Sequence, residues 1–275
     1  MSTDTQEAMT LQKISTRKYR YSPLTRYGRN LLRKINRAID KYDLIKEGDR
    51  VCVSVSGGKD SLSLLNLLFE HRRFYPAHYE ISAIHVVSDF NPNAEHTRDY
   101  LAGLFKTMEV EYAFETMEVT KDKEGNEQNP GCFFCAWKRR ETVFKHCVKT
   151  GCNKLAFGHH SDDVAETTLL NLVYHGNLET ILPTRSFFDG KFDVIRPLFY
   201  VREKDLAYYS KLAGFETGTC VCPNDDSGKR KMMKEVVRGL TKEARNLHVN
   251  LTNASLKWHE VFDDRPLHTK AKKGS

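Results

Sequence analysis

The sequence lacks the features that would place the protein in a membrane or outside the cell. No run of apolar residues approaches the length of about 18–20 that a membrane-spanning helix needs. The N-terminal residues MSTDTQEAMTLQK are polar and contain no apolar segment of the kind that secretory signals carry. We therefore expect a cytoplasmic protein without a membrane partner, and its 275 residues are enough for one or two domains with an ordinary core.

Acidic residues are scarce in two segments, and the positive charge of the chain gathers there. The whole chain has 43 Lys and Arg against 36 Asp and Glu, a net charge of +7. Nine basic residues and no acidic one lie within 11–39, and seven basic against two acidic residues lie within 228–245. Either segment alone could be a solvated helix face. Two such segments at opposite ends of the chain favour a polyanionic partner, because each phosphate contact releases condensed counterions.

The seven cysteines do not predict a disulfide framework, since cytosolic thiols stay reduced. Cys132 and Cys135 form a C-x-x-C pair, and Cys220 and Cys222 form a C-x-C pair. Thiolates are soft ligands that suit iron–sulfur clusters or zinc, and these four residues are therefore candidate metal ligands. The other three fall in apolar or helical surroundings and are expected in the core: Cys52, Cys147 and Cys152.

Strands alternate with helices along the chain, which predicts a doubly wound α/β fold with a mostly parallel sheet. Short apolar runs predict strands at 51–55, 79–88, 111–119, 154–157 and 192–195. Helical periodicity predicts helices over 25–42, 61–72, 95–107, 134–150, 161–175, 202–213 and 229–248. The chain divides into a polar and basic N-terminal segment (1–24), an α/β domain that begins with a basic helix (25–215), and a cysteine-containing, basic helical region (216–275).

A glycine-containing segment, S-V-S-G-G-K-D-S at 54–61, joins the first predicted strand to a helix. Two glycines let the backbone approach a ligand closely, and the helix N-terminus offers unpaired N–H groups. Ser56 and Ser61 add hydroxyl groups, and Lys59 adds a positive charge. The spacing is not that of a Walker A motif, yet the parts of a phosphate-binding loop are combined at a strand–helix junction.

Histidines and carboxylates follow the fourth predicted strand, in G-H-H-S-D-D-V-A-E-T at 158–167. Ser161 or Asp162 is expected to cap the helix that begins there. Asp162 and Asp163 are also candidate oxygen ligands for Mg²⁺ beside a nucleotide. Because the carboxyl ends of parallel strands share one edge of the sheet, we expect this segment to meet the phosphate loop.

For four other polar residues, a purely structural role is an alternative to a functional one. Asp89, after the second predicted strand, could face a nucleotide or form a turn. His85 lies inside that strand and is expected in the core. His160 and Glu166 could be structural only.

The phosphate loop resembles the PP-loop of the N-type ATP pyrophosphatases, which bind the pyrophosphate portion of ATP and transfer AMP to a substrate oxygen. Three further blocks extend the resemblance: the 158–167 segment, I-R-P-L at 195–198 with R-E-K-D at 202–205, and C-F-F-C at 132–135 followed by Arg139 and Arg140. In this order they resemble the tRNA 2-thiocytidine synthetase family of iron–sulfur-dependent RNA thiolases, over roughly residues 28–245. The terminal C-x-x-C zinc pairs typical of the related 2-thiouridine branch do not occur here.

The resemblance implies a site for ATP and Mg²⁺ and assigns residues to it. The nucleotide-binding positions that it implies are Ser54, Ser56, Gly57, Gly58, Lys59, Ser61, Val86, Gly158 and His159. The catalytic positions are Asp60, Arg139, Asp162 and Asp163, with the choice between the two adjacent aspartates left open.

The resemblance also implies a [4Fe–4S] cluster, because members of this family hold one with three cysteine ligands. The fourth iron of that cluster stays open to take a sulfide. Cys132 and Cys135 match two of the ligands directly. At the third, the family commonly has C-x-x-C, whereas this chain has C-V-C at 220–222. Cys222 lies just before the basic helix and is the expected third ligand, with Cys220 as the alternative. The competing hypothesis is a closed zinc site made by all four cysteines.

The activity implied by the resemblance is ATP-dependent adenylation of the C2 oxygen of a cytidine in a tRNA anticodon loop, followed by sulfur transfer from the cluster. The partners implied are tRNA and a sulfide or cysteine-desulfurase sulfur donor, with a homodimer possible. Two other classes stay open. One is a PP-loop ligase or sulfur-transfer enzyme for a small molecule, which does not need the basic segments. The other is a zinc-containing RNA-binding protein, which does not turn over ATP.

Overall fold

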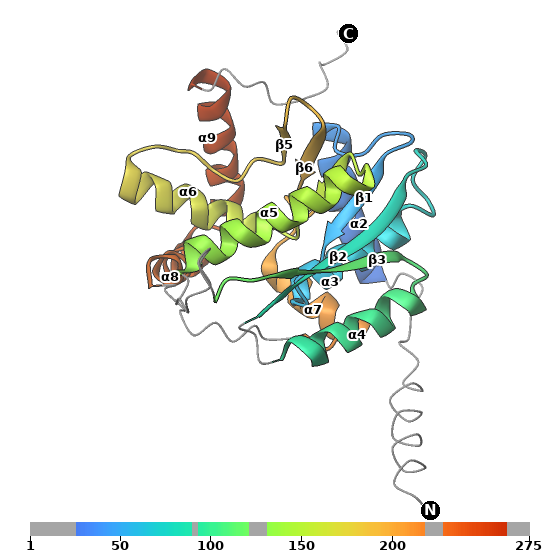
Figure 1. Ribbon diagram of the computed structural model, residues 1–275. Coiled ribbons are helices and arrows are strands. Elements are labelled where there is room, and N and C mark those ends of the chain that lie inside the picture. Colours follow the sequence, from blue (N-terminus) through green and yellow to red (C-terminus); the bar gives the residue numbers. More distant parts are fainter. Residues whose placement is uncertain (1–25, 90–92, 121–130, 218–227, 263–275) are drawn as a thin grey trace, which may run out of the picture.

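In the computed structural model the chain folds around a six-stranded sheet (Figure 1), and the described residues are 26–89, 93–120, 131–217 and 228–262. The strand order is β3-β2-β1-β4-β6-β5, and neighbouring strands are parallel except for β5 and β6. The strands are β1 (Arg50–Ser54), β2 (Glu80–Ser88), β3 (Glu111–Met117), β4 (Lys154–Ala156), β5 (Thr184–Phe187) and β6 (Phe192–Ile195). The helices are α2 (Arg26–Tyr42), α3 (Lys59–His71), α4 (Ala94–Thr107), α5 (Cys132–Thr150), α6 (Ser161–His175), α7 (Glu203–Ala213), α8 (Gly228–Glu243) and α9 (Leu247–Phe262).

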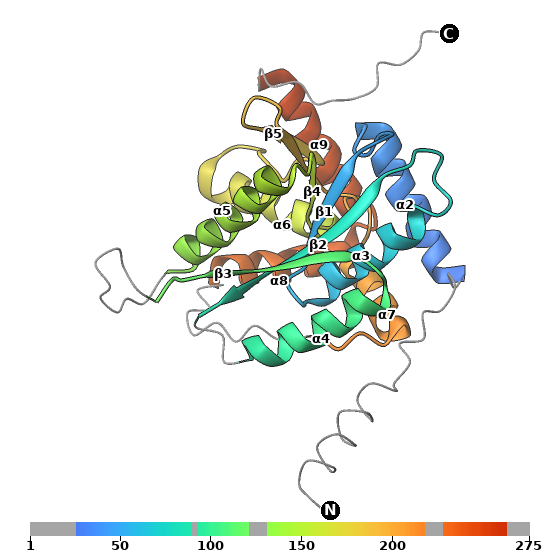
Figure 2. The same cartoon turned by 45° about the vertical axis from the view of Figure 1, so that its right-hand side comes forward.

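Helices cover both faces of the sheet, which confirms the doubly wound α/β fold. Alternate residues of β1 point to opposite layers: Val51 and Val53 belong to the apolar cluster formed with α2, α3 and α4, whereas Cys52 belongs to the cluster formed with α5. Figures 1 and 2 show α5 lying across one face, with α2, α3 and α7 on the other. The predicted parallel order therefore places the carboxyl ends of β1, β2, β4 and β6 along one edge.

The residues predicted to lie in the core are buried. Cys52, Cys147 and Cys152 all lie between α5 and the sheet. His85 is 5% exposed, and its Nδ1 lies 2.7 Å from the carbonyl oxygen of Val55. Burial lowers the pKa of His85, so its ring is neutral at physiological pH.

One strand was not predicted. β5 pairs antiparallel with β6 through a tight connection in which Phe188, Asp189 and Gly190 have positive φ. Only Thr184 of its four residues is buried, so β5 lacks the alternating apolar pattern that marks a strand in sequence.

The prediction of a single helix over 229–248 was wrong in its extent. The segment forms parts of two helices, because α8 ends at Glu243 and α9 begins at Leu247. The last helical hydrogen bond of α8 runs from the Ala244 amide to the Leu240 carbonyl at 2.8 Å. Both helices pack against α6 and form a layer beside the sheet (Figure 1). Among the described residues, no helix combines the length and apolarity that crossing a bilayer requires.

Candidate active site

The phosphate loop connects β1 to α3. Gly57 has a φ of +86°, which L side chains rarely adopt, and a Cβ there would lie 3.1 Å from the Thr97 side chain. The Ser61 hydroxyl accepts from the Ser56 amide at 3.1 Å and donates to the Gly58 carbonyl at 3.0 Å. Gly58 is the N-cap of α3 and provides no side-chain hydrogen bond. Among the described residues no side chain caps the first amides of α3, which lie at the positive end of the helix dipole and suit a phosphate group.

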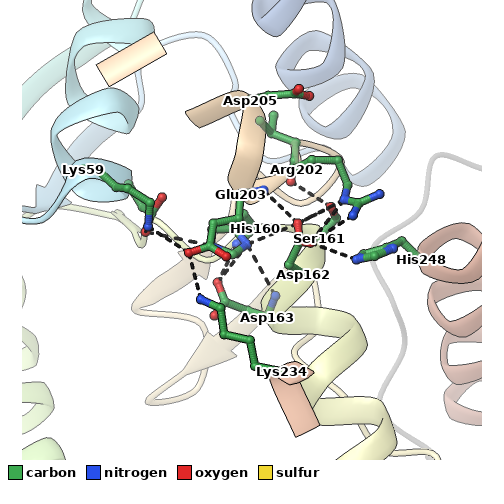
Figure 3. Close-up of polar contacts among 12 residues, drawn as sticks. Lys59, His160, Ser161, Asp162, Asp163, Arg202, Glu203, Asp205, Lys234 and His248 are labelled. Atoms are coloured by element: carbon green, nitrogen blue, oxygen red, sulfur yellow. Dashed lines mark hydrogen bonds and ion pairs between the residues drawn. The ribbon is translucent and has the colours of Figure 1, made fainter. Parts of the chain in front are cut away.

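Lys59 begins α3 and lies between two carboxylates. Its Nζ is 3.1 Å from Asp60 Oδ2 and 3.0 Å from Glu203 Oε1 at the start of α7. Glu203 also accepts a hydrogen bond from Lys234 of α8 at 2.9 Å. Burial opposes the charge on Lys59, but Asp60 and Glu203 outweigh it and raise the pKa of the lysine. Lys59 is therefore a fixed positive charge beside the phosphate loop (Figure 3).

Asp60 has a carboxylate oxygen without a hydrogen-bond partner among the described residues. Its Oδ2 accepts from Lys59, whereas its Oδ1 is buried and unpaired. Burial raises the pKa of Asp60, although His160 and Lys59 oppose that shift. Leaving such an oxygen unsatisfied is unfavourable, and a hard cation such as Mg²⁺ takes oxygens of this kind. Asp60 therefore fits a site for a metal–nucleotide complex.

Gly158 brings the end of β4 against the phosphate loop. A Cβ at Gly158 would lie 3.1 Å from the Ser61 amide nitrogen and 3.2 Å from the Asp60 carbonyl carbon. Both are backbone atoms of the first turn of α3, so no side-chain rotation could make room, and glycine is required for this close approach. The expected meeting of the 158–167 segment with the phosphate loop is confirmed by this contact.

The first turn of α6 is capped by His160, and the expectation that Ser161 or Asp162 caps it was wrong. His160 Nδ1 accepts from the Asp163 amide at 3.4 Å, and Asp163 Oδ2 accepts from the His160 amide at 2.9 Å. This reciprocal pair is a capping box in which a ring nitrogen replaces the usual hydroxyl. The Ser161 hydroxyl instead donates to the Val201 carbonyl at 2.8 Å. His160 thus has the structural role considered for it.

Asp162 connects three helices through its carboxylate (Figure 3). It accepts from Arg202 Nε at 3.1–3.2 Å, from the Glu203 amide at 2.7 Å and from His248 Nε2 of α9 at 2.9 Å. Burial would raise its pKa, but the hydrogen bonds from His248 and Arg202 hold that pKa well below its usual range. Of the three predicted catalytic aspartates, Asp162 is the one most fully bound by other side chains of the described chain.

Helix α5 begins at Cys132 and carries Cys135 one turn further on. Cys135 is 9% exposed and belongs to the same apolar cluster as Val86 of β2. The side chain of Cys132 lies outside the described part of the structure, as do the residues Cys220 and Cys222. Among the described side chains, no three Cys, His, Asp or Glu form a metal-binding group. The ligand set stays a prediction.

Arg139 lies one turn beyond Cys135 and lines a cavity of about 570 Å³ together with His159. Two residues predicted for different roles, one from α5 and one from the segment after β4, therefore share one space. Burial and the nearby Arg196 lower the pKa of His159 to about 4. The imidazole of His159 is consequently neutral at pH 7.

The two basic segments include helices α2 and α8, which lie apart in both views (Figures 1 and 2). Part of their charge serves the fold: Lys34 of α2 pairs with Asp205 at 2.6 Å, and Arg230 of α8 pairs with Asp163 at 3.4 Å. Exposed basic side chains remain on both helices, namely Arg26, Arg29, Arg33, Arg37 and Lys41 on α2 and Lys229, Lys231, Arg238 and Lys242 on α8. Both helices therefore keep a charged outer face.

Some residues at the site carried no recognisable signal. His248 belongs to no motif, and Arg185 lies on the unpredicted strand β5 and lines the same cavity as Arg139. The Asp89 carboxylate accepts from the backbone amides of Val119 (3.1 Å) and Thr120 (3.0 Å), so it links the end of β2 to the segment after β3, and a local turn at Asp89 stays a prediction. Distant positions that meet only in the folded chain leave no spacing to read in sequence.

The fold and its phosphate loop define a PP-loop protein, and a sequence profile of the PP-loop domain matches residues 27–218. The tRNA-cytidine(32) 2-sulfurtransferase of Syntrophotalea carbinolica is 37% identical over 238 residues, which cover 82% of this chain and 88% of that protein. The enzyme of the same name from Citrifermentans bemidjiense is 38% identical over 218 residues, covering 76% and 83%. The chain belongs to the tRNA-cytidine(32) 2-sulfurtransferase family of PP-loop proteins.

A solved structure shares the fold. The U34-tRNA thiolase NcsA from Methanococcus maripaludis, described with its [4Fe-4S] cluster, superposes with a TM-score of 0.72 over 87% of this chain and 81% of that chain, at 20% identity. The likeness at this identity concerns the fold alone. Together with the sequence relatives it confirms the resemblance that the motifs indicated.

Proposed function

We propose that this protein transfers sulfur to C2 of a cytidine in tRNA in an ATP-dependent reaction, with position 32, which the relatives' names specify, as the target. The observation that carries the proposal is the approach of residue Gly158 to the Ser61 amide, which joins the G-H-H-S-D-D segment to the phosphate loop. In a chain of this family, that junction supports an ATP site at the carboxyl edge of the sheet.

In this proposal the triphosphate of ATP lies on the phosphate loop. The α3 amides and the hydroxyls of Ser56 and Ser61 face the phosphates, and Lys59 supplies the positive charge. Asp60 Oδ1 would supply an oxygen ligand for Mg²⁺. The glycines keep the loop free of side chains, and the remaining nucleotide-binding positions are Ser54, Val86, Gly158 and His159.

The reaction begins with transfer of AMP to the base. The cytidine O2 attacks the α-phosphorus of ATP, a P–O bond forms, and the bond between the α- and β-phosphates breaks with its electron pair leaving on pyrophosphate. The C2 oxygen is now part of a good leaving group. A sulfide forms a bond to C2, and the C–O bond breaks to release AMP. The protein supplies position and charge for these steps, through the phosphate loop, Lys59 and Arg139.

The cysteines of α5 and of the segment before α8 would hold a [4Fe–4S] cluster: Cys132, Cys135 and Cys222, with Cys220 as the alternative. The fit rests on α5, where the buried Cys135 is one turn from both Cys132 and Arg139. A bound cluster would supply the sulfur atom, which a sulfide or a cysteine desulfurase provides. Arg139 adds a positive charge next to this thiolate-rich group.

The exposed basic faces of α2 and α8 support contact with the phosphate backbone of tRNA. Bases of an anticodon loop are single-stranded and can be splayed into a protein pocket, unlike bases in a stem. We assign the nucleotide site to the domain 25–215, and the third cysteine and the α8 contact to the region 216–275.

The test is mass analysis of tRNA nucleosides from cells that lack the gene, complemented with wild type or with variants. 2-Thiocytidine should disappear in the deletion strain, return with the wild type, and stay absent with Lys59→Ala or Cys135→Ala. Lys149→Ala is the matched control, since Lys149 is exposed on the same helix as Cys135 and does not line the cavity. Unchanged 2-thiocytidine in the deletion strain contradicts the proposal.

A further inference from the structure

The described lining of the cavity that holds Arg139 and His159 includes four arginines. Arg139 and Arg140 come from α5, Arg185 from β5, and Arg196 is the residue directly after β6. Glu179 is the single carboxylate among the described residues of this lining. Among the described residues, none of the four arginines forms a salt bridge. Four positive charges against one carboxylate repel one another, so this arrangement indicates a site for an anion.

The repulsion among these arginines is most evident at Arg196. Its Nη1 donates to the Leu182 carbonyl at 2.6 Å, while its Nε is buried and has no partner among the described residues. Burial, reinforced by the charges of Arg140 and Arg185, lowers the pKa of Arg196 to about 10. A bound phosphate would relieve this repulsion and accept hydrogen bonds from the guanidinium groups.

The rest of the cavity suits a base. Phe144, Phe157 and Phe187 form apolar walls, and the Phe157 ring lies 5.7 Å from the neutral His159 ring, centre to centre. His159 Nδ1 is buried and unpaired within the described chain. Aromatic surfaces for stacking, one neutral polar ring and a group of arginines are the chemistry that recognises an unstacked nucleotide.

The position of the cavity connects it to both halves of the proposed reaction. Ala136 and Arg139 line it from the helix that carries Cys135 in its first turn. His159 lines it from the residue next to Gly158, which abuts the phosphate loop. A ligand in this cavity therefore lies beside the cysteine-bearing end of α5 and next to the segment that contacts the ATP-binding loop.

We propose that this cavity receives the extruded target nucleotide of the RNA, with its base against the phenylalanines and its phosphodiester on Arg140 and Arg185. This inference rests on the proposed function and specifies where the substrate enters. A cavity of about 570 Å³ is within the usual range for ligand sites. The triphosphate of ATP is held elsewhere, at the loop of residues 56–61, and His159, one of the proposed ATP-binding positions, lies where the two sites adjoin.

The test compares three charge reversals in the full-length protein: Arg140→Glu, Arg185→Glu and the control Lys149→Glu. All three side chains are exposed, and Lys149 lies on α5 but outside the cavity lining. The probes are a tRNA transcript and ATP, each measured separately by equilibrium binding. The cavity variants should bind the tRNA roughly tenfold more weakly, and their affinity for ATP should be unchanged. The dependence of tRNA affinity on salt concentration should weaken in each variant by the amount expected for about one lost phosphate contact. The control should match the wild type.

Photocrosslinking locates the nucleotide without needing turnover. A tRNA that carries 5-iodocytidine at position 32, the position in the relatives' names, should crosslink to peptides containing Phe144, Phe157 or Phe187. Crosslinks confined to α2 or α8 overturn the inference. Unchanged tRNA affinity in both cavity variants also overturns it, and a loss of ATP affinity would instead make the cavity part of the ATP site.

The two proposals fail in different ways. If the deletion strain keeps its 2-thiocytidine, the proposed function fails, whatever the cavity variants do. If 2-thiocytidine depends on the gene while Arg140→Glu and Arg185→Glu bind tRNA like the control, the cavity assignment fails alone.

Discussion

His248 Nε2 lies 2.9 Å from Asp162 Oδ1, and this contact ties α9 to the first turn of α6 across 86 positions of sequence. The same carboxylate binds Arg202, which stands 40 positions away at the start of α7. A residue that the motif marks as catalytic is thus also the point at which three helices meet. The arrangement of α9 therefore depends on the charge of Asp162.

Asp162→Asn is expected to destabilise the fold. The change removes the negative charge beside Arg202 and alters the hydrogen bond with His248, and the free energy of unfolding should fall by roughly 2–4 kcal/mol. Chemical denaturation followed by circular dichroism measures it. Asp99→Asn, at an exposed position of α4, should leave stability unchanged. Equal stability of Asp162→Asn and wild type would show that the contacts of this carboxylate contribute nothing to folding.

Gly158→Ala is expected to weaken ATP binding. The new Cβ would meet backbone atoms at 3.1 and 3.2 Å, so the first turn of α3 must shift. Because the first turn of α3 positions the phosphate loop, this shift should lower the affinity for ATP by roughly tenfold or more. Isothermal titration calorimetry measures that affinity. Gly103→Ala is the control, because a Cβ at that helical position meets nothing within 4 Å. ATP affinity equal to the control's would argue against the close approach.

Glu166 is expected to make stability depend on pH. It is 6% exposed, and burial together with the charge of Asp163 raises its pKa to about 7, from an ordinary value of 4.5. The folded state then binds a proton more tightly than the unfolded state. The stability from this group is therefore complete below pH 4.5 and is lost as pH rises through about 7.

The test compares the free energies of unfolding of wild type and Glu166→Gln at about pH 5 and about pH 8. These two pH values lie on either side of the pKa of Glu166 in the folded protein. The variant should lose less stability over this range, by on the order of 2 kcal/mol, because glutamine does not titrate. Glu235→Gln, an exposed change on α8, should keep the wild-type profile. Parallel profiles for wild type and Glu166→Gln would contradict the raised pKa.

Cys135→Ala is expected to abolish iron binding. Protein prepared without oxygen should contain iron and acid-labile sulfide in the wild type, and the variant should lose both, because three thiolates are needed to hold the cluster. Cys147→Ala changes a fully buried thiol of the same helix and should keep the metal. Metal analysis and the visible absorption spectrum report the result. A colourless wild type that contains zinc would favour the closed zinc site.

Local signals explain which elements were predictable. Helix α6 was expected at 161–175 and is found at Ser161–His175, because Gly176 ends it in the left-handed conformation. β5 and α9 were not predicted, since the former exposes Arg185 and Ser186 and the latter buries the polar residues His248 and Ser255. β5 is held by the adjacent strand β6, whereas α9 packs against α6, which is distant in sequence, and neither contact is marked by local periodicity.

Residue order by itself determined the α/β class, the phosphate loop at 54–61 and the grouping of candidate residues at the carboxyl ends of strands, because these depend on local periodicity and on the handedness of parallel crossovers. Tertiary structure decided which carboxylates are bound. Within the described chain, Asp60 Oδ1 has no hydrogen-bond partner, while the Asp162 carboxylate is held by Arg202 and His248. It also placed Arg185 and Arg196 beside Arg139. Burial and proximity of charges are properties of the packed chain, and no spacing in the sequence encodes them.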